Sequence, residues 1–307
     1  MIAFVLRRLL SAIPTLWVIV TFAFFLMHSV PGGPFDSERT LPPEVEANLE
    51  AAYNLDKPVI VQYGLYLADI VRGDLGPSFK YSDFTVAEVI ASGLPVSAQL
   101  GLTAMSIALV VGVLLGTVAA IRQNSITDYS VMTIAMTGIA IPNFVMAPLL
   151  SLVLGVYLGL LPVAGWNGGA LPNLVLPVTA MALPYVAYIA RLMRGSMIEI
   201  LRSNYIRTAR AKGLRESVVI LRHAMPAAIL PVVSFLGPAT AGILTGSVVI
   251  EQIFSLPGIG KFFVQGALNR DYTLVMGVII FYSSAIILFN IIVDLVYRVL
   301  DPRVRQA

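Results

Sequence analysis

Long apolar runs alternate with shorter polar segments along most of this chain of 307 residues. A helix needs about 20 mostly apolar residues to cross the hydrocarbon core of a bilayer. Six runs approach or exceed that length, at residues 9–30, 96–121, 131–154, 171–190, 227–250 and 274–300. The pattern therefore predicts an all-α integral membrane protein with six transmembrane helices.

The overall composition supports this class of protein. Hydrophobic residues make up 58% of the chain, charged residues only 12%, and the mean hydropathy is +0.86, far from the balance of a soluble domain. The first run follows Arg7 and Arg8 as a secretory signal would, but it is too long and lacks a small-residue cleavage site, so we expect an uncleaved span. The absence of cysteine excludes disulfides and thiolate sites.

The distribution of Lys and Arg predicts the orientation. Fourteen of the 20 basic residues fall at the termini and in the loops on the same side, and six fall on the other side. The positive-inside rule then places both termini and the loop around Arg207 in the cytoplasm. Because the basic residues follow this loop alternation, the net charge of +3 does not indicate a nucleic-acid partner.

The external side carries one large segment, residues 31–95, with ten acidic and four basic residues. Proline and acidic residues predict a helix from 42 toward 53, and weaker patterns predict helices over 59–71 and 85–92. The segment is either a solvated acidic loop or a packed or docking surface. Aromatic side chains favour the second interpretation, and they are Tyr53, Tyr63, Tyr66, Phe79, Tyr81 and Phe84.

Catalytic and energy-coupling motifs are missing from the sequence. The only histidines are His28 and His223, no metalloprotease or serine-hydrolase motif occurs, and Gly260-Lys261 is not part of a phosphate-binding loop. The interiors of the six predicted runs hold no charged residue except Asp294, near a cytoplasmic end, so a proton or ion relay is not indicated. We expect no catalytic residues and no metal site, and His28 is interpreted as an interfacial side chain.

Prolines in the third, fourth and fifth runs predict bent helices that enclose a cavity. These are Pro142, Pro148, Pro177, Pro184, Pro231 and Pro238. Neutral polar residues on the same helices are candidates to line a translocation path, namely Asn143, Thr179, Ser234, Thr240, Thr245 and Ser247. The alternative is that the Ser and Thr hydroxyls bond only their own helix backbone.

Two glycine pairs have the G-x-x-x-G spacing that allows close helix approach, Gly112 with Gly116 and Gly242 with Gly246. We expect them to serve packing, inside this chain or against a second membrane subunit.

The external loop over residues 251–273 contains a proline-glycine turn flanked by apolar side chains that would be costly in water. We expect this turn to rest in the membrane interface or to dip inward. Its candidate external-gate residues are Phe254, Pro257, Gly258 and Gly260.

The cytoplasmic loop over residues 191–226 contains a basic helix with small residues. Ser203 is predicted to cap a helix that begins near Asn204, and Gly213 to end it in the left-handed conformation. A second helical stretch over 216–225 returns to the membrane through Pro226. A basic loop that only touches lipid phosphates would explain the charges, but not the small residues and the glycine, so the helix is predicted to contact a cytoplasmic partner.

The same loop resembles that of the permeases of ATP-binding-cassette importers, whose signature is E-A-A-x3-G-x9-I-x-L-P. Here the spacing matches through Arg207-Thr208-Ala209, Gly213 and residues 223–226, with Arg207, His223 and Met225 in place of glutamate, isoleucine and leucine. These departures resemble the peptide and nickel branch of the binding-protein-dependent permeases. Further motifs of that branch occur at 38–45, 76–81, 165–169 and 269–272.

This resemblance implies a five-helix type I importer core with a first helix and an external segment added in front. The implied segments are a tip and first helix (1–30), an external segment (31–95), the core (96–300) with its coupling loop (191–226), and a cytoplasmic tail (301–307). The implied ATPase-coupling residues are Arg207, Thr208, Ala209, Arg210, Ala211, Lys212, Gly213 and Leu214.

The resemblance also implies partners in the cell inner membrane and on both sides of it. They are a homologous second permease, two cytoplasmic ATPases that hold ATP and Mg, an external peptide-binding protein, membrane lipid and the peptide cargo. This chain would bind no cofactor itself and would carry oligopeptides, with dipeptides or nickel as alternatives. Rival classes are an ion-coupled carrier or channel working alone and a non-transporting scaffold.

Overall fold

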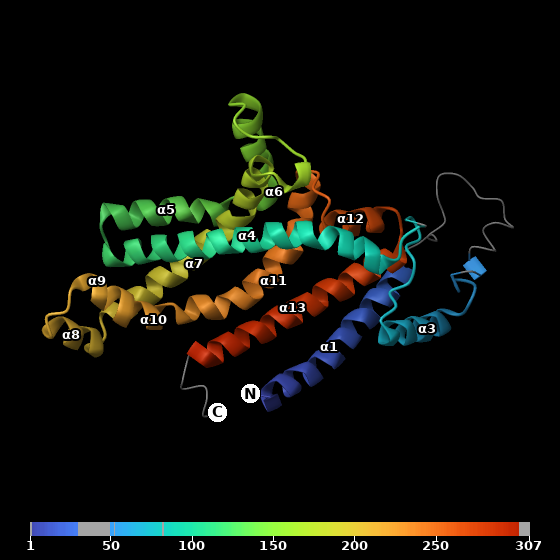
Figure 1. Ribbon diagram of the computed structural model, residues 1–307, viewed down its shortest axis with the longest axis horizontal. Coiled ribbons are helices and arrows are strands. Elements are labelled where there is room, and N and C mark those ends of the chain that lie inside the picture. Colours follow the sequence, from blue (N-terminus) through green and yellow to red (C-terminus); the bar gives the residue numbers. More distant parts are fainter. Residues whose placement is uncertain (1, 30–49, 52, 82, 301–307) are drawn as a thin grey trace. The chain divides into compact units, whose positions relative to one another are not determined.

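The computed structural model describes residues 2–29, 50–51, 53–81 and 83–300, and its regular elements are helices (Figure 1). Within those ranges the only β pairing is one isolated bridge between Pro77 and Thr85. Five helices are long and apolar enough to cross a membrane, and a bent pair would make a sixth span. The five are Leu6–Ser29, Val86–Ile121, Leu171–Leu201, Leu230–Ile253 and Tyr272–Val296. The predicted all-α membrane class is confirmed.

The bent pair replaces the continuous helix predicted over residues 131–154. Helix α5 (Ile126–Ala140) ends before Pro142, and α6 (Asn143–Leu150) continues into the π-helix η1 (Ser151–Tyr157) at an angle of 105° to α5. Ile141 has extended backbone angles, φ −103° and ψ 118°. A residue before proline avoids the α conformation, so the predicted proline bend became a complete break.

Contacts divide the chain into two compact units, residues 1–95 with 257–285 and residues 96–256 with 286–307. Helices α4 (Val86–Ile121) and α13 (Tyr272–Leu300) contribute to both. The first division falls after residue 95, and residues 257–285 group with the segment before it. Residues 257–285 include α12 (Ile259–Leu268), a helix that the sequence analysis did not predict. The segments implied by the resemblance stay a prediction.

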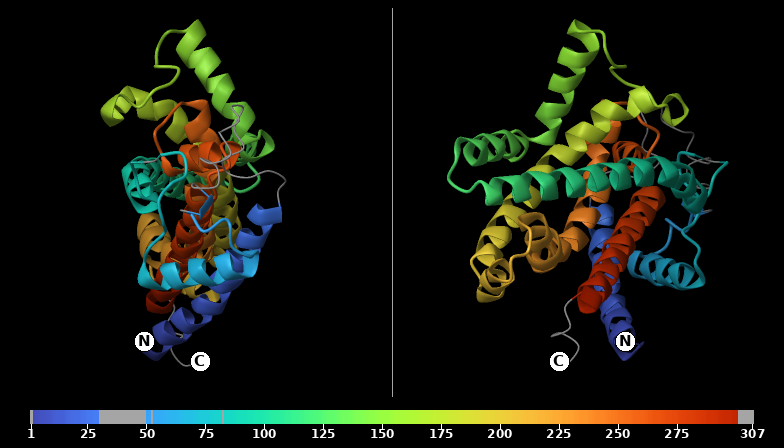
Figure 2. Two further views of the ribbon diagram at one scale, coloured as in Figure 1. Left: turned by 90° about the vertical axis from the view of Figure 1, so that its right-hand side faces the viewer. Right: turned by 60° about the vertical axis from the view of Figure 1, so that its left-hand side comes forward.

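The first unit contains α1 (Ile2–Ser29), α3 (Val59–Arg72), α12 and the adjoining ends of α4 and α13 (Figures 1 and 2). Helix α3 confirms the helix predicted over 59–71, and the one predicted over 85–92 is the first part of α4. The Thr85 backbone N–H donates to the Glu88 carboxylate at 2.8 Å, while the Glu88 N–H faces the Thr85 hydroxyl at 3.3 Å. This reciprocal capping box starts α4. The helix predicted from 42 toward 53 lies mostly outside the described residues.

A buried polar network joins two motifs of the first unit that are 193 positions apart. The hydroxyl of Ser78 donates to the carboxylate of Asp271, and both side chains are fully buried. The same carboxylate accepts from the backbone N–H of Leu274 at 3.0 Å and of Lys80 at 3.2 Å. Asp271 therefore caps α13 and fixes the 76–81 loop, which satisfies its buried charge.

The second unit is built around α7 (Leu171–Leu201), which contains many buried side chains. A Cβ atom at Gly112 would lie 2.7 Å from the Ile189 side chain, and one at Gly116 would lie 2.5 Å from the Ala190 carbonyl oxygen. The first glycine pair thus serves packing of α4 on α7 inside this chain. Gly138 brings α5 equally close to α7, since a Cβ atom added at Gly138 would lie 2.5 Å from the Leu183 carbonyl oxygen.

An ion pair also joins α5 to α7. The Arg194 guanidinium donates two hydrogen bonds of 2.6 Å to Asp128, which is 1% exposed. Asp128 lies in the first turn of α5, and Arg194 lies in α7, which continues to Leu201. Both charged residues are therefore part of helices. The sequence analysis expected no charge inside the apolar runs 131–154 and 171–190, and this pair lies outside both of them, where the helices extend beyond the runs.

Replacing a glycine by alanine is expected to have opposite effects at two positions. Gly116→Ala should destabilise the protein by about 1–3 kcal/mol, since the new methyl group meets backbone atoms that cannot move aside. Gly195→Ala on α7 has no atom within 4 Å of the added Cβ and should stabilise the helix by about 0.5–1 kcal/mol. Melting temperatures of the purified protein in one detergent check both signs. Equal shifts would contradict close packing at Gly116.

Candidate functional site

Helix α8 (Asn204–Ala211) lies at one end of the second unit, after the end of α7 (Figure 1). Ile206 is fully buried and Ala209 is 5% exposed, and α8 packs against the π-helix η3 (Val219–Ala224). Apolar residues three apart on a short helix point to one face. The helix is thereby fixed to its own chain by its inner face.

The outer face of α8 is polar and accessible. Seven of the eight predicted coupling residues are exposed, namely Arg207, Thr208, Arg210, Ala211, Lys212, Gly213 and Leu214. Ala209 is the exception, because it is buried in the same core cluster as Val219 and Ala224. Its small size therefore has a reason within this chain, and the accessible contact surface is formed by the other seven residues.

The predicted end of α8 at Gly213 is confirmed, but the predicted cap at its start is not. Gly213 has φ +76° directly after the last helical turn, which confirms the predicted left-handed end. Ser203 occupies the N-cap position with φ −70° and ψ 155°, but its hydroxyl donates to the Ile200 carbonyl at 2.7 Å. The predicted capping bond of the Ser203 side chain is therefore wrong, since the hydroxyl bonds the preceding helix.

Arg210 and Glu216 connect α8 to the next segment. The guanidinium donates two hydrogen bonds of 2.6 and 3.1 Å to the Glu216 carboxylate. These bonds hold the pKa of Glu216 below its usual range, with the charge of Arg210 as a lesser cause. Both side chains are about half exposed, so the pair contributes modest stability. It orients α8 within the chain.

The predicted second helical stretch after Gly213 is confirmed. It consists of α9 (Glu216–Val218), η3 and α10 (Met225–Ala228), and it leads into α11 (Leu230–Ile253). Val219 and Ala224 of this stretch are fully buried. The segment over residues 191–226 is thus a set of packed helices and not an extended basic loop.

The candidate path residues occupy different environments. Asn143, Thr179 and Thr240 are half-buried, and Ser234 is exposed. The hydroxyls of Ser234 and Ser247 donate to the Leu230 and Leu244 carbonyls at 3.1 and 2.7 Å, as the alternative interpretation expected. The side chain of Thr245 lies outside the described part of the chain. A path lined by these six residues remains a prediction.

The candidate gate residues divide between the two units. Phe254 is 1% exposed in the core of the second unit, and its carbonyl accepts from the Gly165 N–H at 2.8 Å. Pro257, Gly258 and Gly260 belong to the first unit, where Gly258 precedes α12. A Cβ atom at Gly93 would lie 2.9 Å from the Gly258 carbonyl carbon, so this turn packs closely on α4. Gating remains a prediction.

Sequence reasoning also missed a buried carboxylate near the end of α11. Glu251 is fully buried near the end of α11, and its carboxylate accepts from the Ser97 hydroxyl of α4 at 2.7 Å. It directly follows an apolar run and was therefore assigned to a loop. The signal that would have found it is the helical continuation to Ile253. No cluster of three metal-ligating side chains occurs in the part of the chain described.

Family comparison agrees with this membrane-spanning helical fold. Residues 112–306 match the model "Binding-protein-dependent transport system inner membrane component", and residues 1–100 match the N-terminal model of such components. The chain belongs to this family. Its members are non-catalytic permease components, which bears out the expectation that the chain is not an enzyme.

Related proteins span the same length as this chain. It is 54% identical to the oligopeptide transport system permease protein OppB of Haemophilus influenzae and 55% identical to that of Escherichia coli, over 99% of this chain and 100% of each relative. It is 45% identical to the dipeptide transport system permease protein DppB of Bacillus subtilis, over 99% of this chain and 98% of that relative.

Two solved structures share the fold. An amino acid ABC transporter chain has a TM-score of 0.53 at 18% identity, covering 69% of this chain and 94% of that one. A chain of the inward-facing MetNI methionine ABC transporter has a TM-score of 0.51 at 19% identity, covering 70% and 96%. This supports the predicted type I importer core.

Removing the Glu216 charge is expected to loosen α8. Because the pKa of Glu216 is lowered on folding, its contribution is complete above the unfolded-state pKa and is lost as the pH falls through the folded-state pKa. Glu216→Gln should therefore speed amide hydrogen exchange in α8 at neutral pH, by no more than about fivefold for an exposed pair. Glu199→Gln, at an exposed site on α7, is the control. Unchanged exchange in Glu216→Gln would show that the pair does not hold α8.

Proposed function

We propose that this chain forms half of the translocation path of an ATP-driven oligopeptide importer and couples to cytoplasmic ATPases through α8. The observation that carries the proposal is the exposed basic face of α8, fixed to the chain by buried Ile206 and Ala209. Arg207, Thr208 and Ala211 lie on the accessible part of this helix. They are the side chains that an ATPase would contact first.

Movement of α8 would reach the spanning helices through packed contacts. The helix is tied to η3 by its inner face and to α9 by the Arg210–Glu216 pair. It follows directly after α7, which packs on α4 through Gly112 and Gly116. ATP-driven closure of an ATPase dimer would push α8, and rigid helices would pass that displacement to the cavity.

The proposed assembly contains a homologous second permease, two ATPases that hold ATP and Mg, and an external peptide-binding protein. This chain would bind no nucleotide itself. It would lie in the inner membrane, with both of its termini on the cytoplasmic side. The four candidate gate residues would close the path on the outer side. The half-buried Asn143, Thr179 and Thr240 are the candidates best placed to line it.

Oligopeptides are the proposed cargo because the full-length relatives at 54–55% identity are named oligopeptide permeases. A dipeptide permease at 45% identity supplies the alternative cargo within the same class, and nickel is a further one. Uptake by the reconstituted importer should be inhibited by unlabelled oligopeptides more strongly than by dipeptides or nickel. Stronger inhibition by dipeptides or by nickel would change the proposed cargo and not the class.

An ion-coupled carrier working alone is the rival that the structure makes more specific. Glu251 is a buried carboxylate in a spanning helix, the type of group that ion-coupled carriers use. If the rival were correct, vesicles containing this chain without ATPases would take up peptide along an ion gradient. Glu251→Gln would then abolish that uptake.

Cross-linking tests the coupling helix directly, because the chain has no cysteine of its own. Ala211→Cys on α8 should form a cross-link with an ATPase subunit in the assembled importer. Ala267→Cys on α12, which is also an exposed position, is the matched control and should form none. Transport that continues while Ala211→Cys gives no cross-link would refute the proposed contact, and a cross-link only from Ala267→Cys would reverse the topology.

A further inference from the structure

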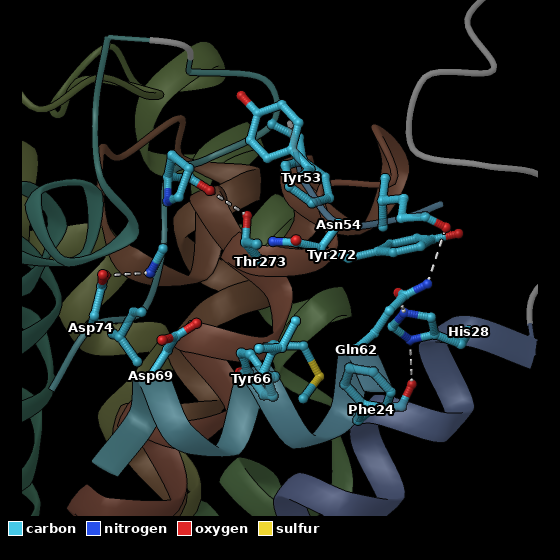
Figure 3. Close-up of a pocket in the computed structure, with 17 residues that line it drawn as sticks. Phe24, His28, Tyr53, Asn54, Gln62, Tyr66, Asp69, Asp74, Tyr272 and Thr273 are labelled. Atoms are coloured by element: carbon cyan, nitrogen blue, oxygen red, sulfur yellow. Dashed lines mark hydrogen bonds between the residues drawn. The ribbon is translucent and has the colours of Figure 1, made fainter. Parts of the chain in front are cut away.

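The first unit contains a pocket of ≈ 220 Å³ that the transport proposal does not use (Figure 3). It lies between the end of α1, α3, the start of α13 and the loops around residues 54 and 75. On the proposed topology these helix ends meet the external side of the membrane. The volume is below the usual 300–1,000 Å³ of sites for drug-sized ligands. It therefore suits one small group.

Six aromatic rings in successive contact form the wall of this pocket. The distances between neighbouring ring centroids are 5.7, 4.0, 5.5, 6.4 and 4.7 Å. In order along the wall the rings are Tyr66, Phe24, His28, Tyr272, Phe79 and Tyr53. Aromatic faces carry negative electrostatic potential and attract organic cations.

The carboxylates of Asp69 and Asp74 in the lining favour the same kind of ligand. Asp69 and Asp74 lie toward one end of the view in Figure 3, and His28 lies toward the other. Asp69 also faces Arg72 at 3.3 Å, but both side chains are about half exposed or more, so this pair is weak. The two nitrogens of His28 already face the Phe24 carbonyl and the Gln62 amide oxygen, at 2.8 and 3.1 Å.

The ring of Tyr66 forms one end of the aromatic wall, and its hydroxyl is closed to solvent. Burial raises the pKa of Tyr66, so the hydroxyl stays neutral and adds no charge to the site.

We propose that this pocket is a binding site for an organic cation that carries an alkylammonium or guanidinium group. The aromatic wall would stack on the cation, and Asp69 and Asp74 would supply the opposite charge. Two sources can present such a group on the external side. One is a free amine in solution, and the other is the ammonium headgroup of a phospholipid in the outer leaflet.

The test is calorimetric titration of the full-length chain in its assembled importer, held in phosphatidylglycerol nanodiscs. The probe is n-propylguanidinium, and the neutral isostere n-propylurea is its control. We expect the cation to bind and the urea to bind at least about tenfold more weakly. Asp69→Asn and Asp74→Asn should each weaken binding of the cation by about fivefold. Asp56→Asn, at an exposed site outside the lining, should leave it unchanged.

A second arm separates the two sources. Adding phosphatidylethanolamine to the nanodiscs should weaken the apparent affinity for the probe if the lipid headgroup occupies the pocket, and should leave it unchanged if the ligand is a free amine. Both outcomes retain the cation site. Equal binding of guanidinium and urea would overturn it, as would unchanged affinity in folded Asp69→Asn and Asp74→Asn variants. None of these outcomes depends on ATP-driven uptake, so failure here leaves the transport proposal standing.

Discussion

Close backbone packing on α7 is the constraint on which most of the second unit depends. Lipid gives apolar helices little hydrophobic reason to associate, so their contacts rely on dispersion between closely fitted surfaces. Gly112 and Gly116 bring α4 onto α7, and Gly138 does the same for α5. The ion pair between Asp128 and Arg194 adds a directional contact at the end of that interface. A helix held this tightly moves with its neighbours.

The first unit depends on polar contacts between distant segments instead. The Asp271 carboxylate accepts hydrogen bonds from the Ser78 hydroxyl, from the backbone N–H of Lys80 in the 76–81 loop and from the backbone N–H of Leu274 in α13. Its burial requires all of these partners. The two motifs that resemble the peptide branch of the family, at 76–81 and 269–272, are therefore two halves of one structural feature. Neither motif is explained by its local segment alone.

The sequence predicted those features that depend on local chemistry. Apolar length located the spanning helices, and the left-handed conformation that Gly213 adopts ended α8 where predicted. The helical stretch after Gly213 and its return through Pro226 also followed from local signals. The break at Pro142 was predicted as a bend, but its angle of 105° depends on how α6 packs beside α7 and α11. The capping bond predicted for Ser203 does not form, because its hydroxyl donates to the Ile200 carbonyl of the preceding helix. The local pattern around Ser203 did not indicate this competing acceptor.

The sequence by itself determined the membrane class, the helical content and the position of the exposed basic helix, because hydrophobic length and charge distribution act residue by residue. Only the tertiary structure decided which face of α8 is accessible, and it turned Ala209 inward into the core of the second unit. It also decided that Glu251 is buried against Ser97 and that six separate aromatic residues line one pocket. These features arise from contacts between segments far apart in the chain, and no local pattern specifies such contacts.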